Sequence, residues 1–483
     1  MPGAPDSVIL SMAVDHGAAE PAYMQIFAQV RSFILTGRLS PGQRLPSTRK
    51  LAEELGLSRT TLVSAYDHLM SEGYIESRRG AGAYVADYSP DQLLTVTGGR
   101  AEPSKPATPP PPASPALPLT PVVREEMLFP FALWARLLQK HWRMPAQGLL
   151  RELDPAGDWA LREAIAEHLR VWRGLNCATD QIFVTAGGAD AADLVLRCIT
   201  ERGDTAYLED PGYNGLRQVA AERGLEKVYQ PVDDEGMVVP EVRAGFTDRQ
   251  VSIVTPSRQF PLGYTMSLAR RVALIDWATR ANGWVIEDDY DSEFRYSGRP
   301  LAAMMSLDET GRVIYLGSFS NVMFKGLRLG FAAVPRQLVE VVQKDLETRG
   351  TNVSTVAQAA LAEFMMSGQF ATHARRMRRL YGRRHAAMMK GLETHCDGLL
   401  TTGSTPGGMS ITTWLTDETR ARMTDTQAAL RLAENDLGVA PLSGFYAHQP
   451  PVDGLILGFS GFDENVIGDS LEKLALVLRS PET

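Results

Sequence analysis

A proline-rich segment divides this chain into two parts that must fold separately. Ten prolines lie between residues 90 and 121, four of them in a row at 109–112. Proline lacks a backbone N–H and fixes φ, so such a segment forms neither a helix nor a central strand and favours an extended spacer. The 483 residues are therefore predicted to comprise an N-terminal domain at 1–87, a linker at 88–122 and a C-terminal domain at 123–483.

The composition is that of an ordinary globular protein. Hydrophobic residues make up 44% and charged residues 22%, and a net charge of −8 argues against coating nucleic acid along the whole length, although it leaves room for one basic module. Cys177, Cys198 and Cys396 are odd in number and far apart, which indicates reduced thiols rather than disulfides or a zinc site. No apolar run reaches the ~18 residues of a membrane span. A cytoplasmic protein without a signal peptide is expected.

The N-terminal zone has the pattern of three short helices. Apolar residues recur with helical spacing over 23–34, and Gly37 ends this first helix. Ser47 and Ser58 are plausible N-caps of the second and third helices, and Gly56 ends the second. The short connection Gly56-Leu57 between the second and third helices is typical of a helix-turn-helix.

A basic hairpin follows the third helix. Segments 74–77 and 83–85 have strand patterns, and the turn between them, RRGAG at 78–82, is basic and glycine-rich. Residues 21–86 contain eight Lys and Arg against five Asp and Glu, a local balance of +3. The basic residues fall at the openings of the second and third helices and at the hairpin tip. This order favours a winged helix-turn-helix that contacts DNA over an ordinary solvated surface.

The C-terminal zone alternates helical patterns with short apolar runs. The runs lie at 181–185, 251–254, 284–286 and 313–316. Strands that alternate with helices predict an α/β domain with a parallel sheet, whose ligands bind at the carboxyl ends of the strands.

Three features of this zone suit a phosphorylated ring cofactor. Gly187 and Gly188 follow a strand and open a helix, where a phosphate binds well. The segment EDDY at 287–290 ends another strand with the carboxylate and phenol that a pyridine ring requires, and Arg328 is a second candidate for the phosphate. Taken singly, a glycine turn is more often structural and an acidic strand end is often only solvated.

The N-terminal zone resembles the GntR family of winged-helix regulators. The motifs are LPSTRKLA at 45–52, LGLSRTT at 55–61, AY at 65–66 and GAGAYV at 80–85. The resemblance implies that Arg49 and Arg59 read bases or phosphates of double-stranded DNA and that Ser47 and Thr60 hold its backbone. It also implies that the wing tip, with Arg79 and Gly80, approaches the minor groove.

The whole chain resembles the MocR subfamily, in which a GntR-like head is fused to a fold-type-I, pyridoxal-phosphate-dependent aminotransferase-like domain. The motifs are EDPGY at 209–213, TPSRQFPLG at 255–263, EDDYDSEFRY at 287–296 and GSFSN at 317–321. The resemblance implies pyridoxal phosphate as cofactor. Its ring nitrogen, ring oxygen and ring face would meet Asp288, Tyr290 and Tyr213, and its phosphate would meet Gly187, Gly188, Ser318 and Arg328.

The sequence departs from that pattern where the chemistry takes place. Asn321 occupies the position of the imine-forming lysine, and an amide nitrogen forms no Schiff base; Lys325, four residues on, need not reach the same point. Arg258 replaces a histidine, and Asp190 places a carboxylate close to the expected phosphate. The run GLILGF at 454–459 lacks the arginine that amino-acid-processing members carry there. These changes argue against a covalently bound cofactor and against catalysis.

A ligand-responsive transcription regulator is the function that the sequence favours. Its body would bind a small amino compound, or the cofactor itself, and shift the DNA-binding heads. A working aminotransferase with a regulatory head is disfavoured by Asn321, and a constitutive DNA-binding dimer with a silent body is the third alternative. Both family resemblances imply a homodimer, with each head packed on the partner's body.

Overall fold

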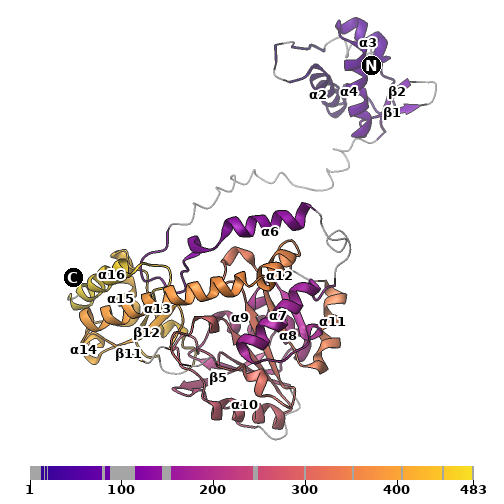
Figure 1. Ribbon diagram of the computed structural model, residues 1–483. Coiled ribbons are helices and arrows are strands. Elements are labelled where there is room, and N and C mark those ends of the chain that lie inside the picture. Colours follow the sequence, from indigo (N-terminus) through magenta and orange to yellow (C-terminus); the bar gives the residue numbers. More distant parts are fainter. Residues whose placement is uncertain are drawn as a thin grey trace. The chain divides into compact units, whose positions relative to one another are not determined.

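The chain forms two compact units. The computed structural model describes residues 12–15, 17–18, 20–78, 82–87, 115–143, 154–242, 249–298, 301–350, 353–403, 406–448 and 451–480. The two units are Met1–Ala113 and Ser114–Thr483 (Figure 1). Most of the predicted linker lies outside the described residues. Its last part, 115–122, belongs to the larger unit, because Leu119 is fully buried in the core of that unit.

The smaller unit is a winged helix-turn-helix, as predicted. Its elements are α2 (Ala22–Leu35), α3 (Thr48–Leu55), α4 (Arg59–Ser71), β1 (Ile75–Arg78) and β2 (Gly82–Val85). The side chain of Ser47 accepts a hydrogen bond from Lys50 N and that of Ser58 accepts one from Thr61 N, so both expected N-caps are present. Gly56 ends α3 in the left-handed conformation at φ 64°, which a side chain would disfavour. The strands β1 and β2 pair antiparallel and form the wing.

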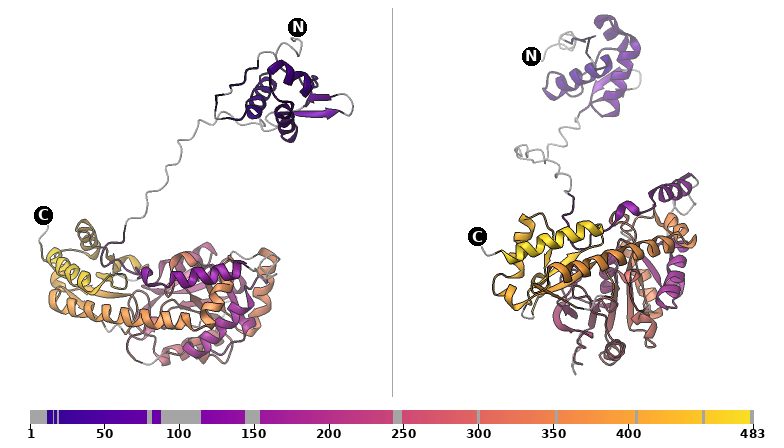
Figure 2. Two further views of the ribbon diagram at one scale, coloured as in Figure 1. Left: turned by 45° about the horizontal axis from the view of Figure 1, so that its top comes forward. Right: turned by 60° about the vertical axis from the view of Figure 1, so that its left-hand side comes forward.

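The larger unit alternates helices and strands. Its helices are α6 (Phe131–Arg143), α7 (Trp159–Arg173), α8 (Gly188–Ile199), α9 (Asn214–Glu222), α10 (Leu268–Arg280), α11 (Arg336–Arg349), α12 (Gln358–Met366), α13 (Gln369–His395), α14 (Asp417–Arg420), α15 (Asp425–Glu434) and α16 (Glu464–Arg479). Figure 2 shows α16 lying along α13. No helix in the described part of the chain is long and apolar enough to cross a membrane.

An eight-stranded sheet forms the centre of the larger unit. Its order is β3 (Ile182–Thr185), β10 (Gly330–Ala333), β9 (Val313–Ser318), β8 (Trp284–Asp289), β7 (Gln250–Val254), β4 (Thr205–Asp210), β5 (Glu226–Asp233) and β6 (Gly236–Met237). The neighbours from β9 to β5 run parallel, as predicted. The strand β10 runs antiparallel between β3 and β9, which the apolar pattern alone did not indicate.

Helices cover both faces of this sheet. Ile182 and Val184 belong to the apolar cluster that includes residues of α7 and α12, whereas Phe183 between them belongs to the cluster with residues of α8 and α11. Because successive side chains of a strand point to opposite faces, these helices lie on opposite sides. The strands from β3 to β4 in the sheet order are therefore largely buried on both faces, as parallel strands of α/β domains are, whereas β5 near the edge is partly exposed.

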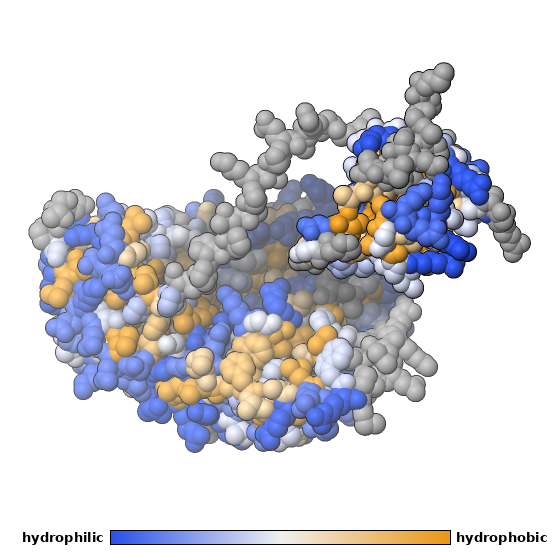
Figure 3. Space-filling model, turned by 90° about the horizontal axis from the view of Figure 1, so that it is seen from above, coloured by the Kyte–Doolittle hydropathy of each residue, from blue (hydrophilic) through white to orange (hydrophobic). Residues whose placement is uncertain are grey.

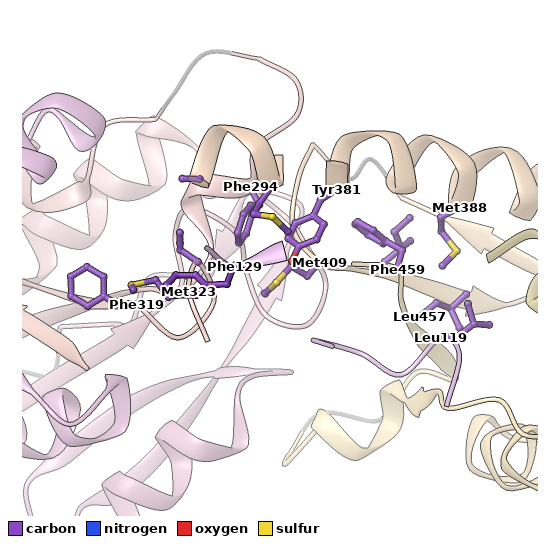
Figure 4. Packing of buried hydrophobic residues seen from close by; sticks show 14 of the residues in the cluster. Leu119, Phe129, Phe294, Phe319, Met323, Tyr381, Met388, Met409, Leu457 and Phe459 are labelled. Atoms are coloured by element: carbon purple, nitrogen blue, oxygen red, sulfur yellow. The ribbon is translucent and has the colours of Figure 1, made fainter. Parts of the chain in front are cut away.

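A second, antiparallel sheet extends the same core. Its order is β11 (Leu400–Thr402), β12 (Ser410–Leu415), β14 (Gly454–Gly458) and β13 (Ala440–Pro441). Figure 4 shows Phe294 facing Tyr381 of α13, with ring centroids 5.0 Å apart, and Leu119 beside Leu457 of β14. This continuous core fixes the segment around Leu119, which precedes α6, against the second sheet.

Candidate functional site: the carboxyl edge of the central sheet

The predicted cofactor residues gather at one edge of the central sheet. Gly330, the first residue of β10, pairs with Thr185 at the end of β3 and with Ser318 at the end of β9. A Cβ on Gly330 would lie 2.9 Å from the Cα of Gly187. The turn after β3 and the end of β9 therefore meet, and ligands bind at such carboxyl ends in α/β sheets.

The glycine turn after β3 forms the start of α8, as predicted. Gly187 is the N-cap at φ 111°, and the free N–H groups of the first turn make a helix start attractive to anions. Asp190 Oδ2 already accepts a hydrogen bond of 2.8 Å from Ala186 N. One backbone N–H group of the turn is thus already hydrogen-bonded to a carboxylate of the chain itself.

The segment that leads into β10 brings basic residues towards this corner. Arg328 is exposed, follows the short 3₁₀ helix η6 (Lys325–Leu327), and adopts the left-handed conformation at φ 51°. Ser318 Oγ accepts a hydrogen bond of 3.3 Å from Ser320 N, and its own O–H group can still donate. Lys325 is exposed within η6. Among the predicted phosphate ligands, Arg328 supplies the positive charge.

Asp288 is the available carboxylate of the site. Its neighbours on β8 point the other way: Asp289 Oδ2 lies 2.9 Å from Arg173 Nε, and Glu287 is fully buried. Within the described residues, Asp288 has neither a hydrogen bond nor an ion pair. Burial, and then the nearby charges of Asp289 and Glu209, raise the pKa of Asp288 to about 7. A cationic nitrogen beside Asp288 would favour the ionised carboxylate and so lower this raised pKa.

Tyr290 is held by the arginine that replaces the expected histidine. Arg258 Nη1 donates to Tyr290 Oη at 2.9 Å and lies 3.2 Å from Asp291 Oδ2, and Arg258 Nη2 donates to Ser410 O at 2.6 Å. Burial raises the pKa of Tyr290 well above its usual range, so the phenol keeps its proton. Tyr290 can therefore donate to a ring oxygen while Arg258 fixes its position.

Aromatic rings line the side of the site near β4. Tyr213, the N-cap residue of α9, is 49% exposed and meets Phe260 edge-on at 5.6 Å between ring centroids. Phe260 also meets Tyr290 at 6.0 Å and Phe445 at 5.3 Å. Tyr213, Phe260 and Tyr290 thus form a series of edge-on ring contacts that ends in the half-exposed ring of Tyr213.

Asn321 is engaged at both ends of its amide. Its Nδ2 donates to Tyr290 O at 2.5 Å, and its Oδ1 accepts from Arg124 Nε at 3.2 Å and also from Arg124 Nη2. Arg124 was not among the residues predicted from the sequence. It lies 197 positions from Asn321 in no local motif, so only the fold reveals the contact.

The predicted DNA-contacting residues lie at the openings of two helices in the smaller unit. Arg49 and Arg59 belong to the first turns of α3 and α4. The side chain of Arg49 is exposed, and its Nε lies 3.2 Å from Glu53 Oε1. Thr60 Oγ1 lies 2.7 Å from Ser58 Oγ. Tyr66 Oη donates to Pro46 O at 3.0 Å and so ties α4 to the chain before α3. Arg79 and Gly80 of the predicted wing tip lie outside the described residues.

Comparison with known families divides the chain into the same two parts as the structure does. Residues 22–85 match the family described as bacterial regulatory proteins, gntR family, and residues 132–452 match aminotransferase class I and II. The chain is similar in fold to a kynurenine aminotransferase from Pyrococcus horikoshii, with a TM-score of 0.69 and 26% identity over 76% of this chain and 91% of that one.

Full-length relatives combine both parts. The chain is 37% identical to the probable rhizopine catabolism regulatory protein MocR of Rhizobium meliloti over 96% of this chain and 95% of that protein. It is 34% identical to the HTH-type pyridoxine biosynthesis transcriptional regulator PdxR of Corynebacterium glutamicum over 92% of this chain and 93% of that protein.

The raised pKa of Asp288 predicts how the stability of the protein depends on pH. A carboxyl that ionises near pH 4 in the unfolded chain but near pH 7 in the folded one binds more protons when folded, so stability falls between those pH values. In ligand-free protein, Asp288→Asn should therefore raise the free energy of unfolding by as much as about 4 kcal/mol at pH 8 and have little effect near pH 4.

Urea unfolding at the two pH values measures this difference. Asp289→Asn is the matched control: it leaves the buried Arg173 without its nearest carboxylate, so it should destabilise the protein at pH 8. Destabilisation by both substitutions at pH 8 would contradict the role given to Asp288.

Proposed function

The chain belongs to the MocR type of GntR-family transcriptional regulators, and we propose that its aminotransferase-like body is a sensor for a small amino compound rather than an enzyme. The observation that carries this proposal is Asn321, whose amide is bound to Arg124 and to Tyr290 O where an aminotransferase needs a free lysine amine. A body that recognises ligands without reacting suits a regulator. The relatives named as regulators support the same conclusion.

The winged helix-turn-helix is the DNA-binding part of the protein. We propose that Arg49 and Arg59, at the openings of α3 and α4, read the operator in the major groove, with Ser47 and Thr60 on its phosphates and the wing tip in the minor groove. The Tyr66–Pro46 hydrogen bond supports this assignment, because it fixes the two helix openings relative to each other. We propose a cytoplasmic location, because a transcription regulator must have access to the DNA that it binds.

The fold family of the body depends on pyridoxal phosphate, and the residues of this site suit a cofactor held without a covalent bond. Asp288 would take the ring nitrogen, Tyr290 the ring oxygen and Tyr213 the ring face; Gly187, Gly188, Ser318 and Arg328 would take the phosphate. Bound cofactor supplies an aldehyde that can capture an amino compound. Asp288 is the best support for this fit, because among the described residues it lacks the cation that a protonated pyridine would bring.

A homodimer is the proposed assembly, with each head on the partner's body. Several apolar side chains around α6 face solvent: Met127 is 83%, Trp142 48% and Phe131 44% exposed. Figure 3 shows apolar patches among polar ones on the face of the larger unit seen from above. Exposed apolar groups of this size on one short segment are typical of an interface.

Two alternatives make different predictions for the purified protein. A working aminotransferase would transfer amino groups, and a constitutive DNA-binding dimer would bind its operator equally with and without ligand. A change of operator affinity on addition of pyridoxal phosphate or an amino compound, without turnover, is expected only of a sensor.

The first prediction concerns DNA recognition. Arg49→Ala and Arg59→Ala should each weaken specific operator binding by about 1–3 kcal/mol, the range for an arginine that reads a base. Fluorescence anisotropy with operator and scrambled DNA distinguishes base reading from phosphate contact, which would weaken both equally. Arg336→Ala, which removes a surface ion pair with Asp180 in the larger unit, is the control and should change neither affinity.

The second prediction concerns assembly. Replacing both Met127 and Trp142 with Glu should raise the dimer dissociation constant about tenfold or more, because charge at an apolar interface is costly. Analytical ultracentrifugation of the full chain measures this constant. Leu430→Glu on α15, where Leu430 is 63% exposed, is the control and should remain dimeric. A monomeric unmodified chain at micromolar concentration would refute the assembly.

The third prediction concerns cofactor attachment. Borohydride treatment of the protein with pyridoxal phosphate should modify no peptide containing residue 321, whereas Asn321→Lys should give a yellow protein modified at that position. Asn321→Gln keeps an amide and should stay colourless. Absorption spectra and peptide mass mapping provide the readout. Cofactor fixed on Lys325 of the unmodified chain would contradict the proposal, and a colourless Asn321→Lys protein would show that the cradle does not hold the cofactor.

A further inference from the structure

Arg124 reaches the site from a segment that is fixed on both sides. Gly458 N of β14 donates to Leu119 O at 2.7 Å, and Ser460 Oγ donates to Val123 O. On the other side of Arg124, the carboxylate of Glu125 lies 2.8 Å from Arg384 Nη2 of α13. The backbone at residue 124 is therefore held by β14 and α13, and its side chain extends from a rigid support.

The same segment is pressed into an unusual backbone conformation. Leu119 and Val122 have φ values of 67° and 61°, in the left-handed region that a β-branched residue such as Val rarely adopts. A Cβ on Gly458 would lie 2.0 Å from Thr120 O, so the segment touches the backbone of β14 directly. Strain of this kind persists where the surrounding structure enforces it, commonly at ligand sites.

Arg124 has no carboxylate partner in the described part of the chain. Its guanidinium donates to one neutral oxygen, Asn321 Oδ1. Glu125 beside it is engaged by Arg384, and Glu126 is exposed. Burial lowers the pKa of Arg124, because the neighbouring charges do not compensate for lost water. A partly desolvated guanidinium with free donors is a receptor for a planar anion.

The other cations of the site are committed or lie elsewhere. Arg258 is paired with Asp291 beneath Tyr290, and Arg328 lies at the corner of the glycine turn. The strand β14 contributes only buried residues of the sequence GLILG to this region and no cation. Among the described residues, Arg124 is thus the guanidinium that contacts Asn321, which in turn donates to Tyr290 O.

We propose that Arg124 is the receptor for a carboxylate of the effector, which makes the effector class an amino acid rather than a simple amine. This inference rests on the proposed sensor function and specifies its ligand. The amino compound would meet the aldehyde of the cofactor, which is adjacent to the ring oxygen assigned to Tyr290. Its carboxylate would replace or share the Asn321 amide as the partner of the guanidinium. Two parallel N–H···O bonds to a carboxylate would give both affinity and orientation.

The experiment compares two ligands that differ only in the carboxylate. N-(5′-phosphopyridoxyl)glycine and N-(5′-phosphopyridoxyl)glycinamide are titrated by calorimetry into the full-length protein, with pyridoxal phosphate as a third ligand that lacks the group. The unmodified chain should prefer the glycine conjugate by about tenfold or more, as expected for a charge-assisted hydrogen bond. Arg124→Gln should abolish this preference and leave the affinity for pyridoxal phosphate unchanged.

Two further variants make the result specific. Arg124→Lys keeps the charge but loses the planar fork, so it should retain part of the preference; thermal melting verifies that both variants are folded. Arg336→Gln removes an exposed guanidinium of the same unit and should retain all of it.

The outcomes separate this inference from the function on which it rests. A preference for the carboxylate that survives in Arg124→Gln would overturn the role of Arg124. Equal binding of both conjugates to the unmodified chain would also overturn the role of Arg124. In either case, binding of pyridoxal phosphate would leave the proposed sensor function standing. If the unmodified chain binds none of the three ligands, the cofactor cradle and the carboxylate receptor are both wrong.

Discussion

The close approach of three strands at Gly330 is the constraint on which the site depends. A side chain there would collide with Gly187 of the turn after β3 and with Gly317 O of β9. Because β10 runs antiparallel between β3 and β9, its first residue lies where both neighbours end. The helix start at Gly188 and the hydroxyl of Ser318 are thereby brought to one corner by backbone pairing alone.

Much of the fold follows from local patterns that tertiary structure did not override. The N-caps Ser47 and Ser58, the stop at Gly56 and the strand that contains Phe183 were predicted, because caps, glycine conformations and apolar runs act over a few residues. The parallel neighbours were predicted because helices separate their strands. The antiparallel β10 was not, since a strand of four buried residues carries no mark of its direction.

The candidate site could be predicted only where a family motif names its members. Asp288, Tyr290 and Arg328 lie in such motifs, and the structure places them at the carboxyl edge of one sheet. Arg124 could not be predicted, because its contact with Asn321 depends on a strained segment pressed against β14. The ordered end of the proline-rich segment was missed for a similar reason. Proline excludes regular elements, but it does not prevent Leu119 from entering a core.

The unpaired state of Asp288 links ligand recognition to protons. A carboxyl with a pKa of about 7 is partly protonated at neutral pH, and a cation bound beside it favours the ionised form. Binding of a protonated ring or amine would therefore release a fraction of a proton into solution, and affinity would increase as the pH rises through neutrality. A regulator built on this carboxyl would respond to the same effector concentration more strongly in a slightly alkaline cell than in an acidified one.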